Sequence, residues 1–353
     1  MSKSHPGRFF EDFRLGERLP HATPRTVTAG DVALHTALYG SRYALFCADT
    51  FAQGCGLPRS PVDPLLVFHL VFGKSVPDVS LNAVANLGYA EGRFGAPVFP
   101  GDTLAAESQV IGLKATSGGT TGVVHVRTVG RNQAGAEVLA YVRWVLVRKR
   151  GGGGGAADPE PHAPTLQIAV AAADLRLPDG LDFSGYDFAL AGASHAFEDY
   201  EVGERIDHLD GMAVEEAEHQ LATRLYQNTA RVHFNAWARA NEPSGRRLVY
   251  GGVVISTAQA LAFNGLANAG LVLAVNGGRH VNPFFAGGTL FAWSEVLDKA
   301  ILSESVGALR LRRVATVDRP CADFPDKDGE GRYPPEVVLD FDYWAAVPRR
   351  RRR

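Results

Sequence analysis

The chain has 353 residues, of which 46% are hydrophobic and 21% are charged, and its formal net charge at pH 7 is −2. This length accommodates one large domain or two of about 150 residues, and the small net charge gives no reason to expect a nucleic acid or a membrane as partner. Three cysteines fit neither a disulfide framework nor a zinc-ligand spacing. From these cysteines we expect a protein of the reducing cytoplasm without a metal site. The first residues lack an apolar signal core, and no run of roughly 18 apolar residues occurs.

Helices precede strands in each half of the chain. Hydrophobic periodicity predicts helices over 31–38, 64–72, 218–225 and 253–267, and strands that include 120–128 and 136–147. Three long strands rich in Val, Leu and Thr are expected after each second helix. A long buried helix followed by an antiparallel sheet that can wrap it is an α+β arrangement. The absence of alternating strand–helix units, of Gly-x-Gly-x-x-Gly and of a Walker pattern argues against a nucleotide-binding α/β fold.

The second half of the chain repeats the first. Three anchors recur in the same order, with 10–18 returning as 197–205, 92–104 as 278–290, and 138–144 as 338–344. The first anchor, FEDFRLGER, returns as FEDYEVGER at an offset of 187 (197 − 10). We therefore predict two copies of one module, 1–150 and 194–353. A connecting segment, 151–193, separates them, and its five consecutive glycines, Gly151 to Gly155, indicate a flexible linker.

One histidine distinguishes the two copies. The segment YQNTARVH ends at His233, with Asn228 five residues earlier, whereas the matching segment of the first copy has Ser41 and Phe46 at these two positions. A lone histidine near an asparagine is more often structural than catalytic. Its retention in only one copy favours a catalytic role in the second module.

The repeats resemble the MaoC-type hydratases in their double-hotdog form. The turn PVFPGDTL (Pro97 to Leu104) carries part of this resemblance, and the segment ending at His233 is similar to the family's hydratase motif, an aromatic residue followed by Gly-Asp-x-Asn-Pro-x-His. The resemblance implies that each module wraps an antiparallel sheet around a central helix, that the two sheets join edge to edge, and that the first copy serves as a substrate-binding half. Three features resemble those of the mesaconyl-CoA hydratases, also called β-methylmalyl-CoA dehydratases. They are the segment QNTARVHF, the VYGG before the second central helix and the length of the chain.

This resemblance implies a hydro-lyase that reversibly hydrates a short branched dicarboxylic enoyl-CoA, with mesaconyl-CoA giving β-methylmalyl-CoA. The acyl-CoA is then the substrate, and no separate cofactor is expected because CoA is part of it. Two alternatives stay open. One is an (R)-specific fatty enoyl-CoA hydratase. The other is a hotdog protein that binds an acyl thioester, or hydrolyses it as a thioesterase, without hydratase activity. A homo-oligomer is left open as well.

The implied catalytic residues are His233 and Asn228. Hydration adds water at Cβ and a proton at Cα, and a histidine can hold and return a proton near neutral pH. Family members usually have a carboxylate where Asn228 stands, and an amide can orient a water or an imidazole but cannot accept a proton. Either His233 carries all the proton transfer, or a carboxylate assists, for which the candidates are Glu216, Glu218 and Asp63.

The implied binding residues lie nearby in the sequence. Gly251 and Gly252 open the second central helix, whose free N–H groups would stabilise negative charge on the thioester oxygen. The free carboxylate of a dicarboxylic acyl group requires an arginine. Arg231 and Arg279 are the candidates for that role, and Tyr226 completes the expected substrate contacts.

Overall fold

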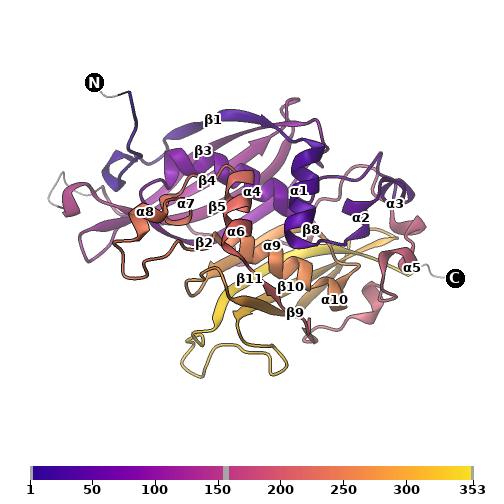
Figure 1. The fold of residues 1–353 in the computed structure, drawn as a ribbon. Helices are drawn as coiled ribbons and strands as arrows, with labels where there is room; N and C mark the ends of the chain where they lie inside the picture. The colour runs from indigo at the N-terminus through magenta and orange to yellow at the C-terminus, as the bar shows by residue number, and fades with distance from the viewer. Residues whose placement is uncertain (1–2, 154–158, 351–353) are drawn as a thin grey trace.

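The computed structural model describes residues 3–153 and 159–350, and its centre is one antiparallel sheet of eleven strands (Figure 1). The strands are β1 (Arg18–Thr26), β2 (Ala83–Phe94), β3 (Thr103–Ala115), β4 (Thr121–Arg131), β5 (Glu137–Arg148), β6 (Arg205–Asp207), β7 (Met212–Ala213), β8 (Leu271–His280), β9 (Thr289–Ile301), β10 (Val306–Val317) and β11 (Val337–Pro348). Their order is β1-β3-β4-β5-β2-β8-β11-β10-β9-β6, and β7 pairs with β9. The two repeats therefore join edge to edge where β2 pairs with β8.

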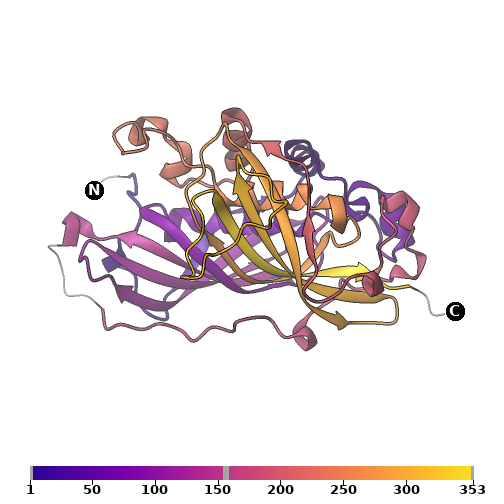
Figure 2. The ribbon, with the colours of Figure 1, turned by 90° about the horizontal axis from the view of Figure 1, so that it is seen from below.

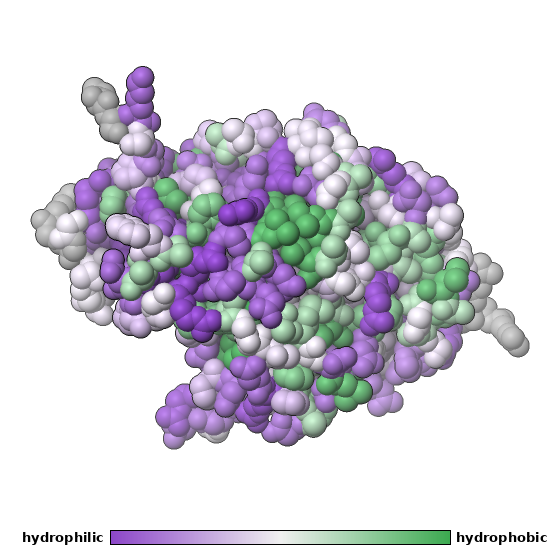
Figure 3. All heavy atoms as spheres, viewed as in Figure 1, coloured by the Kyte–Doolittle hydropathy of each residue, from purple (hydrophilic) through white to green (hydrophobic). Residues whose placement is uncertain are grey.

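The helices cover one face of this sheet, as the views from the front and from below show (Figures 1 and 2). They are α1 (Ala29–Tyr39), α2 (Ala44–Cys47), α3 (Asp49–Gly54), α4 (Pro64–Val79), α5 (Phe188–Ala191), α6 (Glu216–Leu225), α7 (Arg231–Phe234), α8 (Ala236–Arg239), α9 (Gly251–Leu261) and α10 (Phe263–Leu266). All of α4 is buried except Pro77 and Asp78. The surface on this side is mixed, with a compact apolar area between α1 and α6 (Figure 3).

Equivalent side chains of the two repeats meet in the core. The hydroxyls of Tyr39 and Tyr226 lie 2.7 Å apart, and His69 Nε2 lies 2.9 Å from Ser256 Oγ. Each pair is separated by the repeat offset of 187 residues. A residue contacts its own counterpart only near a two-fold axis, so the modules pack around an approximate two-fold axis between α4 and α9.

The predicted α+β arrangement is confirmed, with two differences in detail. Four long strands follow α4 rather than three, because β2 is rich in Ala and Gly and has a single β-branched residue, Val84. The helix expected over 253–267 ends at Leu261. Asn264 and Gly265 leave the helical conformation, and Gly265 has a φ of +100°.

The segment after the linker crosses the sheet on the face opposite the helices (Figure 2). His162 pairs with Leu113 of β3, and further along Val170 accepts a hydrogen bond from Trp344 Nε1 at 3.0 Å. This segment therefore contacts strands of both modules. The predicted flexible run Gly151 to Gly155 lies in part outside the described residues, and its described beginning forms a short 3₁₀ turn.

Candidate active site

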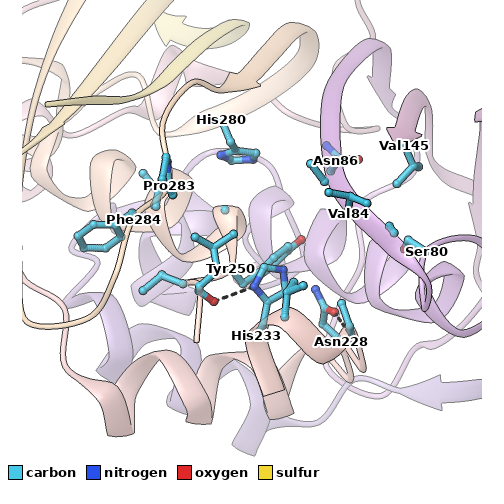
Figure 4. A pocket seen from close by; sticks show the side chains of 18 of the residues that line it. Ser80, Val84, Asn86, Val145, Asn228, His233, Tyr250, His280, Pro283 and Phe284 are labelled. Atoms are coloured by element: carbon cyan, nitrogen blue, oxygen red, sulfur yellow. Dashed lines mark hydrogen bonds between the residues drawn. The ribbon is translucent and has the colours of Figure 1, made fainter. Parts of the chain in front are cut away.

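A cavity of about 280 Å³ lies beside the junction of the modules, at the start of α9 (Figure 4). Both modules contribute polar side chains to its lining. The second module supplies Asn228, His233, Tyr250, His280 and Asn282, and the first supplies Ser80, Asn86, Tyr89 and Arg143. Much of the remaining lining is apolar, which keeps the dielectric low and strengthens electrostatic interactions inside. No Asp or Glu occurs among the described residues that line this cavity.

One ring nitrogen of His233 forms a hydrogen bond, and the other has no hydrogen-bond partner among the described residues. Its Nδ1 lies 2.8 Å from the carbonyl oxygen of Leu248. Because a carbonyl only accepts, Nδ1 must carry the proton in the neutral ring, which leaves the lone pair on Nε2. Burial lowers the pKa of His233 to about 4. At neutral pH the ring is therefore uncharged and available as a base.

Asn228 presents a donor rather than an acceptor to the cavity. Its side chain is buried, and its Oδ1 accepts a hydrogen bond from the backbone N–H of Ala230 at 3.0 Å. This bond fixes the orientation of the amide, because reversing it would set two donors against each other. The Nδ2 group has no partner among the described residues. Asn228 lies beside His233, so its amide can donate a hydrogen bond to a water held there (Figure 4).

His280 is a cavity residue that the sequence analysis missed. It enters from the end of β8, opposite His233 (Figure 4), and its Nε2 lies 3.2 Å from the Tyr89 hydroxyl. Burial lowers its pKa to about 4. The repeat carried a signal for it, since His280 stands where the first copy has Phe94, the same one-sided exchange as Phe46 for His233.

The start of α9 forms the floor of the cavity. Gly251 lines it, and a Cβ there would come within 2.2 Å of the His280 ring, so only glycine allows this contact. Gly252 lies behind the cavity wall, where a Cβ would overlap the rings of Tyr250 and His69. The first N–H groups of a helix have no acceptor within it, so Gly251 can direct a donor at a ligand.

The structure does not bring the other predicted binding residues to the cavity. Tyr226 is fully buried, with its hydroxyl bonded to Tyr39. Arg231 donates to Asn82 Oδ1 at 2.7 Å and to a backbone carbonyl near the N-terminus. Arg279 is exposed, because alternate side chains of a strand face opposite ways and its neighbour His280 takes the inward position.

The three candidate carboxylates also lie elsewhere. Glu216 pairs with Arg247 on the surface. Glu218 caps α6 by accepting from the N–H of Glu215, and Asp63 caps α4 by accepting from the N–H of Leu65. None of these three residues lines the cavity.

A serine–histidine–aspartate array outside the cavity has a structural explanation. His21 lies 2.7 Å from both Asp78 and Ser108, as in a hydrolase triad. However, Ser108 is 0% exposed and lines none of the described pockets. The second module repeats the pair as His208 and Ser294 at 2.8 Å, so these bonds belong to the fold of the module.

The described residues contain no group of three or more His, Cys, Asp or Glu side chains arranged to hold a metal ion. They also contain no helix of sufficient length and hydropathy to cross a membrane.

Comparisons with known proteins agree with this architecture. A family model described as mesaconyl-CoA hydratase matches residues 2–321. The chain is 58% identical to a β-methylmalyl-CoA dehydratase of Chloroflexus aurantiacus, with 99% of each chain covered. It is 61% identical to a mesaconyl-CoA hydratase of Cereibacter sphaeroides, with 98% of this chain and 100% of the relative covered.

Solved structures show the same fold. A MaoC domain protein from Chloroflexus aurantiacus superposes with a TM-score of 0.96 at 58% identity, covering 99% of this chain and 100% of the other. A Mycobacterium tuberculosis protein described as a double hotdog superposes with a TM-score of 0.76 at 25% identity, covering 97% and 99%. The predicted double hotdog is thereby confirmed, and the chain belongs to the mesaconyl-CoA hydratase family of MaoC-like proteins.

Proposed function

We propose that this chain hydrates mesaconyl-CoA to β-methylmalyl-CoA, reversibly, in the cavity lined by His233. One observation carries the residue-level proposal: the second repeat places His233 and the unpartnered amide donor of Asn228 in the cavity lining, at positions where the first repeat has Phe46 and Ser41. Family membership supports the substrate, since relatives at 58% and 61% identity are named for the two directions of this reaction.

The reaction begins with a water held between Asn228 and His233. Asn228 Nδ2 donates a hydrogen bond to the water oxygen, and His233 Nε2 takes a proton from it as the oxygen bonds to Cβ. The electrons of the C=C bond move to the thioester, which becomes an enolate. The N–H of Gly251 at the positive end of α9 stabilises the enolate oxygen.

The proton then returns to the substrate. The His233 imidazolium, whose charge is disfavoured by burial, gives its proton to Cα and completes the addition of water. His280 packs against Gly251 and keeps the helix start in position beside the thioester. Dehydration follows the same steps in reverse. CoA is part of the substrate rather than a separate cofactor, and the thioester bond stays intact throughout.

The three cysteines, all of them free thiols, support placing this reaction in the reducing cytoplasm. The thioesterase alternative lacks support in the geometry. The serine of the cavity lining, Ser80, accepts hydrogen bonds from Arg143 and has no histidine among its hydrogen-bond partners in the described structure. A serine of this kind is not activated as a nucleophile.

The proposed function is tested by incubating the protein with mesaconyl-CoA and following the loss of enoyl-thioester absorbance. We expect the absorbance to fall and the product to have gained one water, without release of CoA thiol. A thiol reagent run in parallel distinguishes hydrolysis. Unchanged absorbance, or thiol release in step with its loss, would contradict the proposal.

A further inference from the structure

The first module places a buried arginine in the wall of the cavity. Arg143 projects from β5, is 0% exposed and lines the cavity. Arginine is almost never fully buried unless it is paired. Its partners among the described residues are the hydroxyls of Ser75 at 2.8 Å and Ser80 at 3.3 Å, and no carboxylate pairs with it. Its Nε has no partner in this part of the chain.

The surroundings of Arg143 leave its charge only partly compensated. The guanidinium lies 4.3 Å from the centre of the Phe72 ring, a favourable contact for a cation but one without a negative charge. Two neutral hydroxyls and one ring do not replace the hydration of a charged group, and an uncompensated buried charge is strongly destabilising. An anion that enters the cavity therefore gains a preorganised partner.

A second donor accompanies it. Asn86 of β2 lines the same cavity, and both polar atoms of its amide are buried without a partner among the described residues. An arginine and an amide donor in the lining of one cavity suit the two oxygens of a carboxylate. Such unpartnered polar groups are costly in an empty cavity and are satisfied when a ligand binds.

We propose that Arg143, assisted by Asn86, binds the free carboxylate of the acyl group and thereby selects dicarboxylic over monocarboxylic enoyl-CoA substrates. This inference rests on the proposed function. It makes Arg143 the residue that determines specificity, in place of Arg231 and Arg279, which the structure leaves outside the cavity.

The chemistry of the substrate explains why such a contact also orients the reaction. In mesaconyl-CoA the free carboxylate is attached to Cβ, the carbon that receives the water oxygen. Arg143 on the first module would hold this carboxylate, while His233 and Asn228 on the second module hold the water. The guanidinium also reduces the repulsion between the carboxylate and the incoming hydroxide-like oxygen.

The second module provides a matched control. Arg313 is equally buried, at 2% exposed, and lies 4.9 Å from the centre of the Tyr343 ring. It donates to Ser294 and Gln259, and one of its terminal nitrogens is also unpartnered within the described structure. It does not line the cavity. Replacing it tests the effect of losing a buried arginine without touching the proposed carboxylate site.

The test compares Arg143→Met, Arg143→Lys and Arg313→Met with the parent. For each protein, kcat/KM is measured with mesaconyl-CoA and with crotonyl-CoA, which lacks the free carboxylate. The ratio of the two values should fall by at least about 30-fold in Arg143→Met and by less in Arg143→Lys, which keeps the charge but loses the planar fork. In Arg313→Met the ratio should stay within about threefold.

The ratio is informative because a general folding defect lowers both rates together. Where a variant turns over too slowly, calorimetry compares its binding of succinyl-CoA and butyryl-CoA, and the preference of the parent for succinyl-CoA should disappear in Arg143→Met. Unchanged preference in both assays would overturn the role of Arg143. A parent that hydrates neither enoyl-CoA would instead overturn the proposed function.

Discussion

Replacing Asn228 with aspartate tests how the cavity controls the proton on His233. The substitution keeps the shape of the side chain, and one carboxylate oxygen can still accept from the N–H of Ala230 as Oδ1 does now. The other oxygen takes the place of the unpartnered Nδ2 and brings a negative charge beside His233. A negative neighbour favours the imidazolium, so the pKa of His233 should rise.

The size of the effect follows from the parent value. With a pKa of about 4, roughly nine-tenths of the parent holds a neutral His233 at pH 5. A carboxylate at close range raises the pKa of a histidine by about 1–3, which puts the variant at about 5–7. The neutral fraction at pH 5 then falls to about one half for the smaller change and about 1% for the larger one.

The assay is kcat/KM for mesaconyl-CoA between pH 4 and pH 9, with circular dichroism at each pH to verify folding. The acid limb, below which His233 is protonated and inactive as a base, should lie near pH 4 in the parent and higher in Asn228→Asp. Asn228→Ala should lose about 10- to 100-fold in rate without an upward move of the limb. If the acid limb of Asn228→Asp lay at the same pH as that of the parent, or at a lower pH, the reasoning would be refuted.

Two further predictions concern the whole chain. Titration calorimetry should find one succinyl-CoA bound per chain, because Phe46 and Phe94 occupy the first-module positions of His233 and His280; two equivalent sites would contradict the assignment. The free energy of unfolding should fall between pH 7 and pH 5, because burial lowers the pKa values of His35 and His208 to about 3, so the unfolded chain binds protons there that the folded chain does not. The loss is about 2 kcal/mol for each of these two histidines at pH 5, and urea denaturation that gives the same value at both pH values would show that they do not stay neutral in the fold.

The architecture could be predicted because the repeat is recognisable from matching sequence segments. Matched anchors such as Phe10 and Phe197 establish two modules, and the helix-then-strand order establishes the α+β class. The number of strands was harder to predict from the sequence. β2 lies between β5 and β8 and pairs with both, which holds it in an extended conformation although its composition does not favour a strand. A pattern within one segment of sequence does not reveal this support from neighbouring strands.

The site was predictable only in part, for two physical reasons. The sequence places Arg279 in a segment expected to line the pocket, but it does not show whether Arg279 or His280 faces inward, because that direction depends on the register of the strand. Arg143 was missed because it comes from the other module, about 90 residues from His233, and only the fold brings it to the same cavity. A comparison of the repeats for positions at which one copy changes from apolar to titratable would have identified His280.

The most direct test of the account is kcat for mesaconyl-CoA hydration by His233→Ala. We expect a loss of about 10²- to 10⁴-fold relative to the parent, as is typical when a general acid–base group is removed. The matched variant Phe46→Leu changes the equivalent position of the first module and should act only through packing, with kcat near that of the parent. A folded His233→Ala protein whose kcat stays within about threefold of the parent would contradict the assignment of the active site.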